Sequence, residues 1–166
     1  MPRRLASTHH WEPGESVEAN AARVLPRMAH EYFAAGRKIV ASKPDPAALH
    51  PFRLKTKQIR YTLEGFRGVY GDSVAALLEK LKPLQNALGD VNDSVATRAE
   101  FDLGETFDAF LRQRARSKAK EFCKAWKKGF DVSGEEARWV SILSKVEAAI
   151  DSHHLAGDEV RSSQEK

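Results

Sequence analysis

Apolar residues recur every three or four positions along most of the chain, which is the spacing of amphipathic helices. The first stripe covers residues 17–39 and is closed by the proline-containing segment 43–46. A second stripe covers residues 52–70 and stops at a Gly-Asp pair. A third covers residues 77–95, where Pro83 predicts either a kink or a late helix start.

Two more stripes follow, at residues 107–126 and 139–150, separated by the Val-Ser-Gly break at 132–134. No β-branched run alternates with polar residues, and no Asn-Gly or Asp-Gly hairpin pair occurs. Short connections favour antiparallel neighbours. We therefore predict an all-α fold, an antiparallel four-helix bundle with an additional C-terminal helix, over residues 15–155. Flexible tails are expected at 1–14 and at 156–166, the latter acidic.

Composition agrees with one globular domain, because the 166 residues are 42% hydrophobic and 30% charged. The single cysteine, Cys123, cannot form an internal disulfide and falls among apolar neighbours, so we interpret it as a small core residue in a reducing compartment. No apolar run is long enough to span a membrane, and the first residues lack the apolar segment of a secretory signal. These features predict a cytoplasmic protein with no membrane partner.

Charge is distributed unevenly around a formal net value of +4. Residues 50–130 hold 16 Lys and Arg against 10 Asp and Glu, whereas residues 131–166 hold 4 against 8. A basic middle section favours anionic partners. It does not choose among nucleic acid, a membrane surface and phosphate polymers, and a plain solvated surface remains an alternative.

A row of polar side chains is expected on one face of the second helix. Its members are spaced by 3, 4, 3 and 4 residues: His50, Arg53, Lys57, Arg60 and Glu64. At about 100° per residue they lie within roughly 80° of one another. Adjacent cations oppose the helix by ~0.2–0.5 kcal/mol per pair, and Arg and Lys both suit phosphate oxygens. The row therefore predicts an anion site in a groove bordered by Leu54 and Tyr61, the alternative being a solvated stripe with His50 at the helix start.

Other cations are weaker candidates. Lys80 and Lys82 are placed near the start of the third helix, where Asn92 and Asp93 further along could bond back to the second. Arg23 and Arg27, on the side of the first helix that also carries His30 and Arg37, would face the anion if the first two helices are neighbours; otherwise they are surface arginines. On the fourth helix, a ridge either extends a polyanion track or is a solvated face: Arg112, Arg116, Lys120 and Lys127.

Two segments resemble a known family. Residues 49–64 (LHPFRLKTKQIRYTLE) are similar to the histidine motif of the CHAD family (conserved histidine α-helical domain), H-x-L-R-x-x-x-K-x-x-R-Y-x-x-E. Residues 81–93 (LKPLQNALGDVND) resemble that family's L-K-x-L-Q-x-x-L-G-x-x-N-D segment. Phe52 stands where the family usually has Leu, and Gln58 where it often has Arg or Lys. The resemblance covers roughly residues 14–130.

The resemblance implies an all-helical protein that binds inorganic polyphosphate in a basic cavity. It makes His50, Arg53, Lys57 and Arg60 the phosphate ligands and Lys82 a further one. Arg23, Arg27 and Lys80, which are selected by their positions on the helices, are the next candidates. CHAD domains commonly hold two bundles in one chain, whereas a single histidine motif occurs here. A homodimer is expected, since a twofold pair would rebuild the double bundle.

Two other functions are weighed against polyphosphate binding. A nucleic-acid partner fits the charge, but no helix-turn-helix cue, RNP motif or GXXG loop occurs. A phosphohydrolase would use His50 as an acid and Asp90 with Asp93 as metal ligands, but a carboxylate cluster and a Gly-rich phosphate loop are missing. We therefore expect a non-catalytic protein with no cofactor and no metal, associated with polyphosphate granules.

Overall fold

The structure is a computed structural model that describes residues 11–145. In chain order its elements are α1 (Val17–Ala41), the 3-10 helix η1 (Pro46–Leu49), α2 (His50–Gly65), α3 (Arg67–Tyr70), α4 (Asp72–Glu100), α5 (Glu105–Gly129) and α6 (Glu135–Ser144). No strand occurs among these residues. The predicted all-α class is confirmed.

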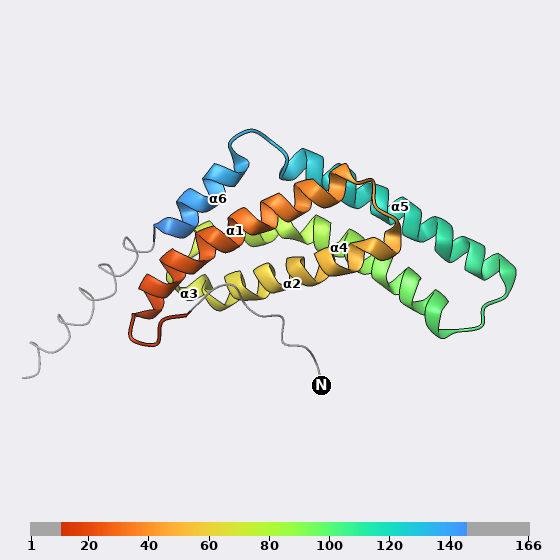
Figure 1. Ribbon diagram of the computed structural model, residues 1–166, viewed down its shortest axis with the longest axis horizontal. Helices are drawn as coiled ribbons and strands as arrows, with labels where there is room; N and C mark the ends of the chain where they lie inside the picture. Colours follow the sequence, from red (N-terminus) through yellow and green to blue (C-terminus); the bar gives the residue numbers. More distant parts are fainter. Residues whose placement is uncertain (1–10, 146–166) are drawn as a thin grey trace, which may run out of the picture.

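The long helices α1, α2, α4 and α5 alternate in direction, and η1 forms the turn between α1 and α2 (Figure 1). α4 packs on both α2 and α5, while the short α6 returns along α1 (Figure 1). Four long helices with a shorter C-terminal one were predicted, and this arrangement is confirmed. Val146 and Ile150, which were expected to continue the last helix, lie outside the described residues, as do most of the two expected tails.

Local capping explains where the first two elements begin. The Ser16 side chain accepts a hydrogen bond from the Ala19 amide at 3.1 Å, so α1 begins directly after it. The Asp45 side chain does the same for the Ala47 amide at 3.0 Å, and Pro46 occupies the first position of η1. Gly71 has a positive φ of 58°, and its turn separates α3 from α4.

The start of α4 corrects one expectation. Pro83 lies inside a helix that begins at Asp72, so the late start proposed for this segment is wrong. A proline inside a helix costs about 3 kcal/mol. Burial of Leu77, Leu81, Leu84 and Leu88, at about 1.5–3 kcal/mol each, outweighs that cost. Packing therefore carries the helix through the proline.

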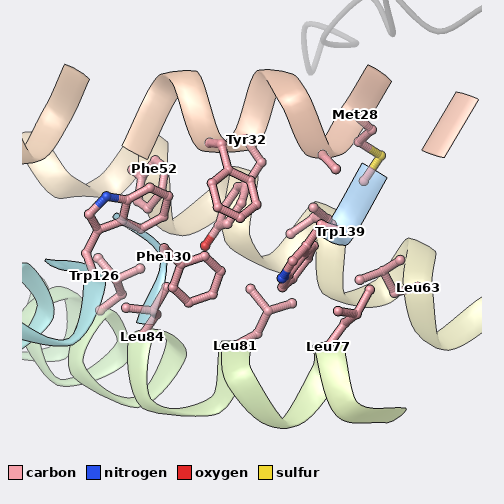
Figure 2. Close-up of a cluster of buried hydrophobic side chains, with 14 of the residues drawn as sticks. Met28, Tyr32, Phe52, Leu63, Leu77, Leu81, Leu84, Trp126, Phe130 and Trp139 are labelled. Atoms are coloured by element: carbon pink, nitrogen blue, oxygen red, sulfur yellow. The ribbon is translucent and has the colours of Figure 1, made fainter. Parts of the chain in front are cut away.

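Aromatic side chains fill the core between α1, α2, α5 and α6 (Figure 2). Trp126 of α5 stacks on Phe130 with ring centroids 4.9 Å apart, and both contact Tyr32 of α1. Gly36 of α1 faces Trp126 so closely that a Cβ there would overlap the indole ring. The close approach of α1 and α5 thus requires glycine at this position.

Candidate functional site

α2 places the motif cations by burying the opposite face of the helix. Phe52, Ile59 and Leu63 are buried in the core, with Thr56 on the same side. At 3.6 residues per turn, this leaves Arg53, Lys57 and Arg60 half-buried at the edge of the core. The sequence row is therefore present on one helix face.

A polar groove of about 620 Å³ lies between α2 and α4, and we call it the α2–α4 groove. Its α2 wall is made of Arg53, Thr56, Lys57 and Tyr61. Its α4 wall is made of Gln85, Asn86, Leu88, Gly89, Asp90 and Asp93. A Cβ at Gly89 would meet nothing within 4 Å, so the glycine leaves open space on this wall.

The charges of the groove come from both walls. Arg53 and Lys57 have no carboxylate partner within residues 11–145, and the Lys57 ammonium lies 5.8 Å from the centre of the Tyr61 ring. The opposite wall carries two carboxylates, Asp90 and Asp93. The groove is therefore less basic than the sequence row alone predicted.

Cations of a third helix, α5, pair with one of these two carboxylates. Asp90 binds Arg114 of α5 at 2.8 Å and Lys118 of α5 at 3.5 Å. Lys118 is also held by Glu121 at 2.8 Å. Asp93 has no ion-pair partner in the described part of the chain. Arg114 and Lys118 are thus cations next to the groove that the sequence analysis did not select, although their i,i+4 spacing was a visible signal.

Arg60 is held in place by its neighbours on α2. Its Nη1 donates to the Glu64 carboxylate at 2.6 Å, and its guanidinium carbon lies 4.2 Å from the centre of the Tyr61 ring. A hydrogen bond from Arg60, together with the charges of Lys57 and Arg60, lowers the pKa of the Tyr61 hydroxyl below its ordinary value. Arg60 is therefore oriented beside the groove with part of its charge already neutralised.

His50 lies at the other end of the row and is fixed by α4. Its Nδ1 hydrogen-bonds with the Asn92 side-chain oxygen at 2.9 Å, which confirms that Asn92 bonds back to α2; no such bond from Asp93 occurs. His50 lines a separate, mainly apolar hollow of about 220 Å³ with Leu88 and Val95, not the α2–α4 groove. Nδ1 is engaged, so only Nε2 remains for a ligand.

The two candidate lysines of α4 point in different directions. Both lie well inside α4, which begins at Asp72, and not near its start. Lys82 is on the same face as Gly89, at about 20° in helical projection, and pairs with Glu79 at 2.6 Å. Lys80 instead binds Glu135 of α6; burial would raise the pKa of that carboxyl, but hydrogen bonds from Lys80 and Trp139 lower it. Lys80 thus attaches α6 to α4.

The α1 row does not face the α2 row. His30 and Arg37 both bind Glu136 of α6, at 2.5 and 2.6 Å, so this side of α1 is turned toward α6. Arg23 binds Glu15 and the Asn20 side chain, at 3.1 and 2.8 Å. Arg27 is exposed, on the same side. The expectation that α1 and α2 cations meet across one anion is wrong, because α6 occupies the space beside α1.

A comparison with family models places the chain. The family described as CHAD domain matches residues 2–102, which contain both motif segments and the α2–α4 groove. The chain belongs to the CHAD family. The match ends just after α4, so α5 and α6 lie beyond it, whereas the sequence resemblance had been extended to residue 130. No curated protein and no solved structure shows significant similarity to this CHAD protein.

Within residues 11–145, no three His, Cys, Asp or Glu side chains are grouped so that they would hold a metal ion. None of the helices in that same range is long and apolar enough to cross a membrane.

Proposed function

We propose that this CHAD protein binds inorganic polyphosphate in the α2–α4 groove and does not catalyse a reaction there. One observation carries the proposal: Arg53 and Lys57 line a polar groove without a carboxylate partner, while Asp90, one of the two carboxylates on the opposite wall, is paired with Arg114 and Lys118 of α5. Membership of the CHAD family supports the same ligand.

The groove supplies cations suited to several phosphates of one polymer. A micromolar dissociation constant requires about 8 kcal/mol. Hydrogen bonds to charged groups contribute about 1.5–3 kcal/mol each, so Arg53 and Lys57 with one or two flanking cations reach that value. Lys82 lies on the α4 face of the groove and Arg60 beside its α2 wall, and both lengthen the track. Asp93 opposes binding and limits its strength.

The test is a titration of the protein with polyphosphate of defined length. An Arg53→Ala/Lys57→Ala variant should lose about 3–6 kcal/mol of binding free energy, which is at least a hundredfold in affinity. A matched control, Lys38→Ala/Arg67→Ala, removes two exposed cations outside the groove and should change affinity far less. Unchanged affinity in a double variant that keeps its helical circular dichroism would reject the site.

The same preparation tests specificity and catalysis. RNA added as competitor should displace polyphosphate poorly, since Tyr61 is the one aromatic side chain among the lining residues and Arg60 already lies over its ring. Polyphosphate incubated with the protein and Mg²⁺ or Mn²⁺ should release no phosphate above the protein-free rate. Equal competition by RNA would instead favour the nucleic-acid alternative, and phosphate release would favour a phosphohydrolase. Binding of this kind also predicts that the protein accumulates in polyphosphate granules.

A homodimer is the second part of the proposal. Phe101, Phe107 and Phe110 are 50–61% exposed where α4 turns into α5, and the last two rings stack with centroids 6.1 Å apart. Exposed aromatic patches of this kind mark association surfaces. A second copy joined there would supply the second bundle common in CHAD domains. Light scattering at micromolar concentration should give a dimer mass, and a Phe107→Ser/Phe110→Ser variant should give a monomer mass.

A further inference from the structure

A second and larger groove, of about 810 Å³, lies between α5 and the connection from α1 to η1; we call it the α5 groove. Its floor is made of small apolar groups: Val40, Pro44, Pro46, Ala119 and Cys123. Its cations are Lys43, Arg116, Lys120, Lys124, Lys127 and Lys128. At 1.5 Å per residue, the α5 wall from Arg116 to Lys128 is about 18 Å long.

The chemistry of the lining restricts what the groove can bind. No acidic residue lines it, and none of its six cations has an ion-pair partner within residues 11–145. No lining side chain carries an oxygen atom or an aromatic ring. A nucleobase would find no side-chain hydrogen-bond acceptor and no aromatic ring here, and only the guanidinium of Arg116 to stack on, whereas an inorganic polyanion would leave the apolar floor uncovered.

We propose that the α5 groove binds a single-chain aliphatic anion, an alkyl or acyl chain that ends in a phosphate or carboxylate. The alkyl or acyl chain lies on the apolar floor, which the methylene groups of the lysine side chains extend. The ammonium groups bind the anionic end. A volume of about 810 Å³ is within the range of small-molecule sites. The apolar lining residues are buried or half-buried while the six cations are exposed, which fits one dissolved amphiphile better than a bilayer.

The backbone at Lys43 supports a role for its side chain. Lys43 follows the C-terminal cap of α1 with φ of +49°, a left-handed conformation that glycine or asparagine adopts with less strain. A residue with a strained backbone and a side chain that lines a groove is typical of a functional position. Lys43→Gly should therefore raise the melting temperature of the protein while it lowers the affinity of the α5 groove for the anion.

The two grooves are independent. In helical projection, Lys118, which faces Asp90 and the α2–α4 groove, lies roughly 160° from Lys120, which faces the α5 groove. The α5 wall also lies outside the residues that match the CHAD family. Failure of the polyphosphate proposal would leave this one untouched.

Cys123 provides the readout, because it is the only cysteine of the chain and lines the α5 groove. Burial raises the pKa of its thiol, so alkylation by neutral N-ethylmaleimide is followed at mildly alkaline pH. Dodecyl phosphate, kept below its micelle concentration and at about ten times its dissociation constant, should slow alkylation about tenfold by mass action. Inorganic phosphate, polyphosphate and decanol should protect little.

Charge variants separate the two grooves. Lys124→Glu/Lys127→Glu should abolish protection by dodecyl phosphate and leave polyphosphate binding unchanged, whereas Arg53→Ala/Lys57→Ala should do the opposite. Protection by inorganic polyphosphate equal to that by dodecyl phosphate would overturn the proposal in favour of a plain cationic track. Protection by decanol alone, by vesicles of anionic phospholipid alone, or by no probe would overturn it as well.

Discussion

The α2–α4 groove and the α5 groove differ in how their cations are surrounded, although both are basic at the level of sequence. In the α2–α4 groove, Arg53 and Lys57 face two carboxylates of α4, one of them bound by α5. In the α5 groove, six cations border an aliphatic floor and no carboxylate lines it. One set of surroundings favours a polyanion without an apolar part, and the other favours an anion with an apolar chain.

Under the two proposals, the number of cations does not decide the ligand. The larger number lies in the α5 groove, where all of the cations except Lys43 come after the residues that match the CHAD family. The polar walls of the α2–α4 groove, with amide groups from Gln85 and Asn86, suit phosphate oxygens that keep part of their hydration. Four measurements test this contrast.

Salt should separate the grooves most strongly. If four cations (Arg53, Lys57, Arg60 and Lys82) each release a counterion, a roughly fourfold rise in salt weakens polyphosphate binding by roughly 50-fold, with the slope known for single-stranded nucleic acids. Binding of dodecyl phosphate should weaken only a few-fold, since burial of its uncharged alkyl chain supplies part of the binding free energy. The measurements are isothermal titration for the polymer and Cys123 protection for the amphiphile. Equal salt slopes would remove the distinction.

A glycine of the buried core and a glycine of the α2–α4 groove give the next largest effect. Gly36→Ala places a methyl group against Trp126 and should cost about 1–3 kcal/mol of unfolding free energy, because the packed core must shift. Gly89→Ala meets only open space in the α2–α4 groove, and should stabilise α4 by about 0.5–1 kcal/mol. Urea unfolding followed by circular dichroism checks both. Equal changes would show that the two helices pack differently from the structure.

Removal of the unpaired carboxylate should strengthen polyphosphate binding. Asp93→Asn deletes a negative charge from the α4 wall, which is worth at most about 1 kcal/mol at an exposed site, or roughly fivefold in affinity. Asp102→Asn, at an exposed position outside both grooves, serves as the control. Protection of Cys123 by dodecyl phosphate should not change in either variant. A loss of polyphosphate affinity in Asp93→Asn would instead give Asp93 a direct role in binding.

The smallest expected effect is on a tyrosine titration. Arg60 and Lys57 lower the pKa of Tyr61, while burial raises the pKa of Tyr70 to about 12 and that of Tyr32 further. The first phenolate to form as the pH rises is therefore Tyr61. Bound polyphosphate adds negative charge and pairs with Arg60 and Lys57, so the pKa of Tyr61 should rise toward its ordinary value. Ultraviolet absorbance of the phenolate measures the shift. Dodecyl phosphate should not change the pKa of Tyr61, the first tyrosine to ionise.

Sequence periodicity predicted the fold well and the site in part. Helix boundaries near residues 17 and 41 follow from a cap and from prolines, which are local signals. The second helix was expected to continue to the Gly-Asp pair at 71–72, but α2 ends at Gly65 and α3 follows as a separate short helix. The cationic face of α2 follows from 3.6 residues per turn. The same reasoning misplaced the start of α4, because a proline is a strong local signal that the burial of four leucines overrides. It also treated Phe107 and Phe110 as part of an apolar stripe, whereas both are exposed.

By itself, the sequence determined which residues share a helix face, because that depends only on the geometry of one helix. It therefore determined the CHAD motif, the row on α2 and the ridge on α5. Which faces meet was decided only by the tertiary structure: α6 beside α1 engages His30 and Arg37, and α5 beside α4 brings Arg114 and Lys118 to Asp90. The physical reason is that the strength of a charge in a protein depends on its nearest counter-charges and solvent exposure, and packing of distant segments sets both.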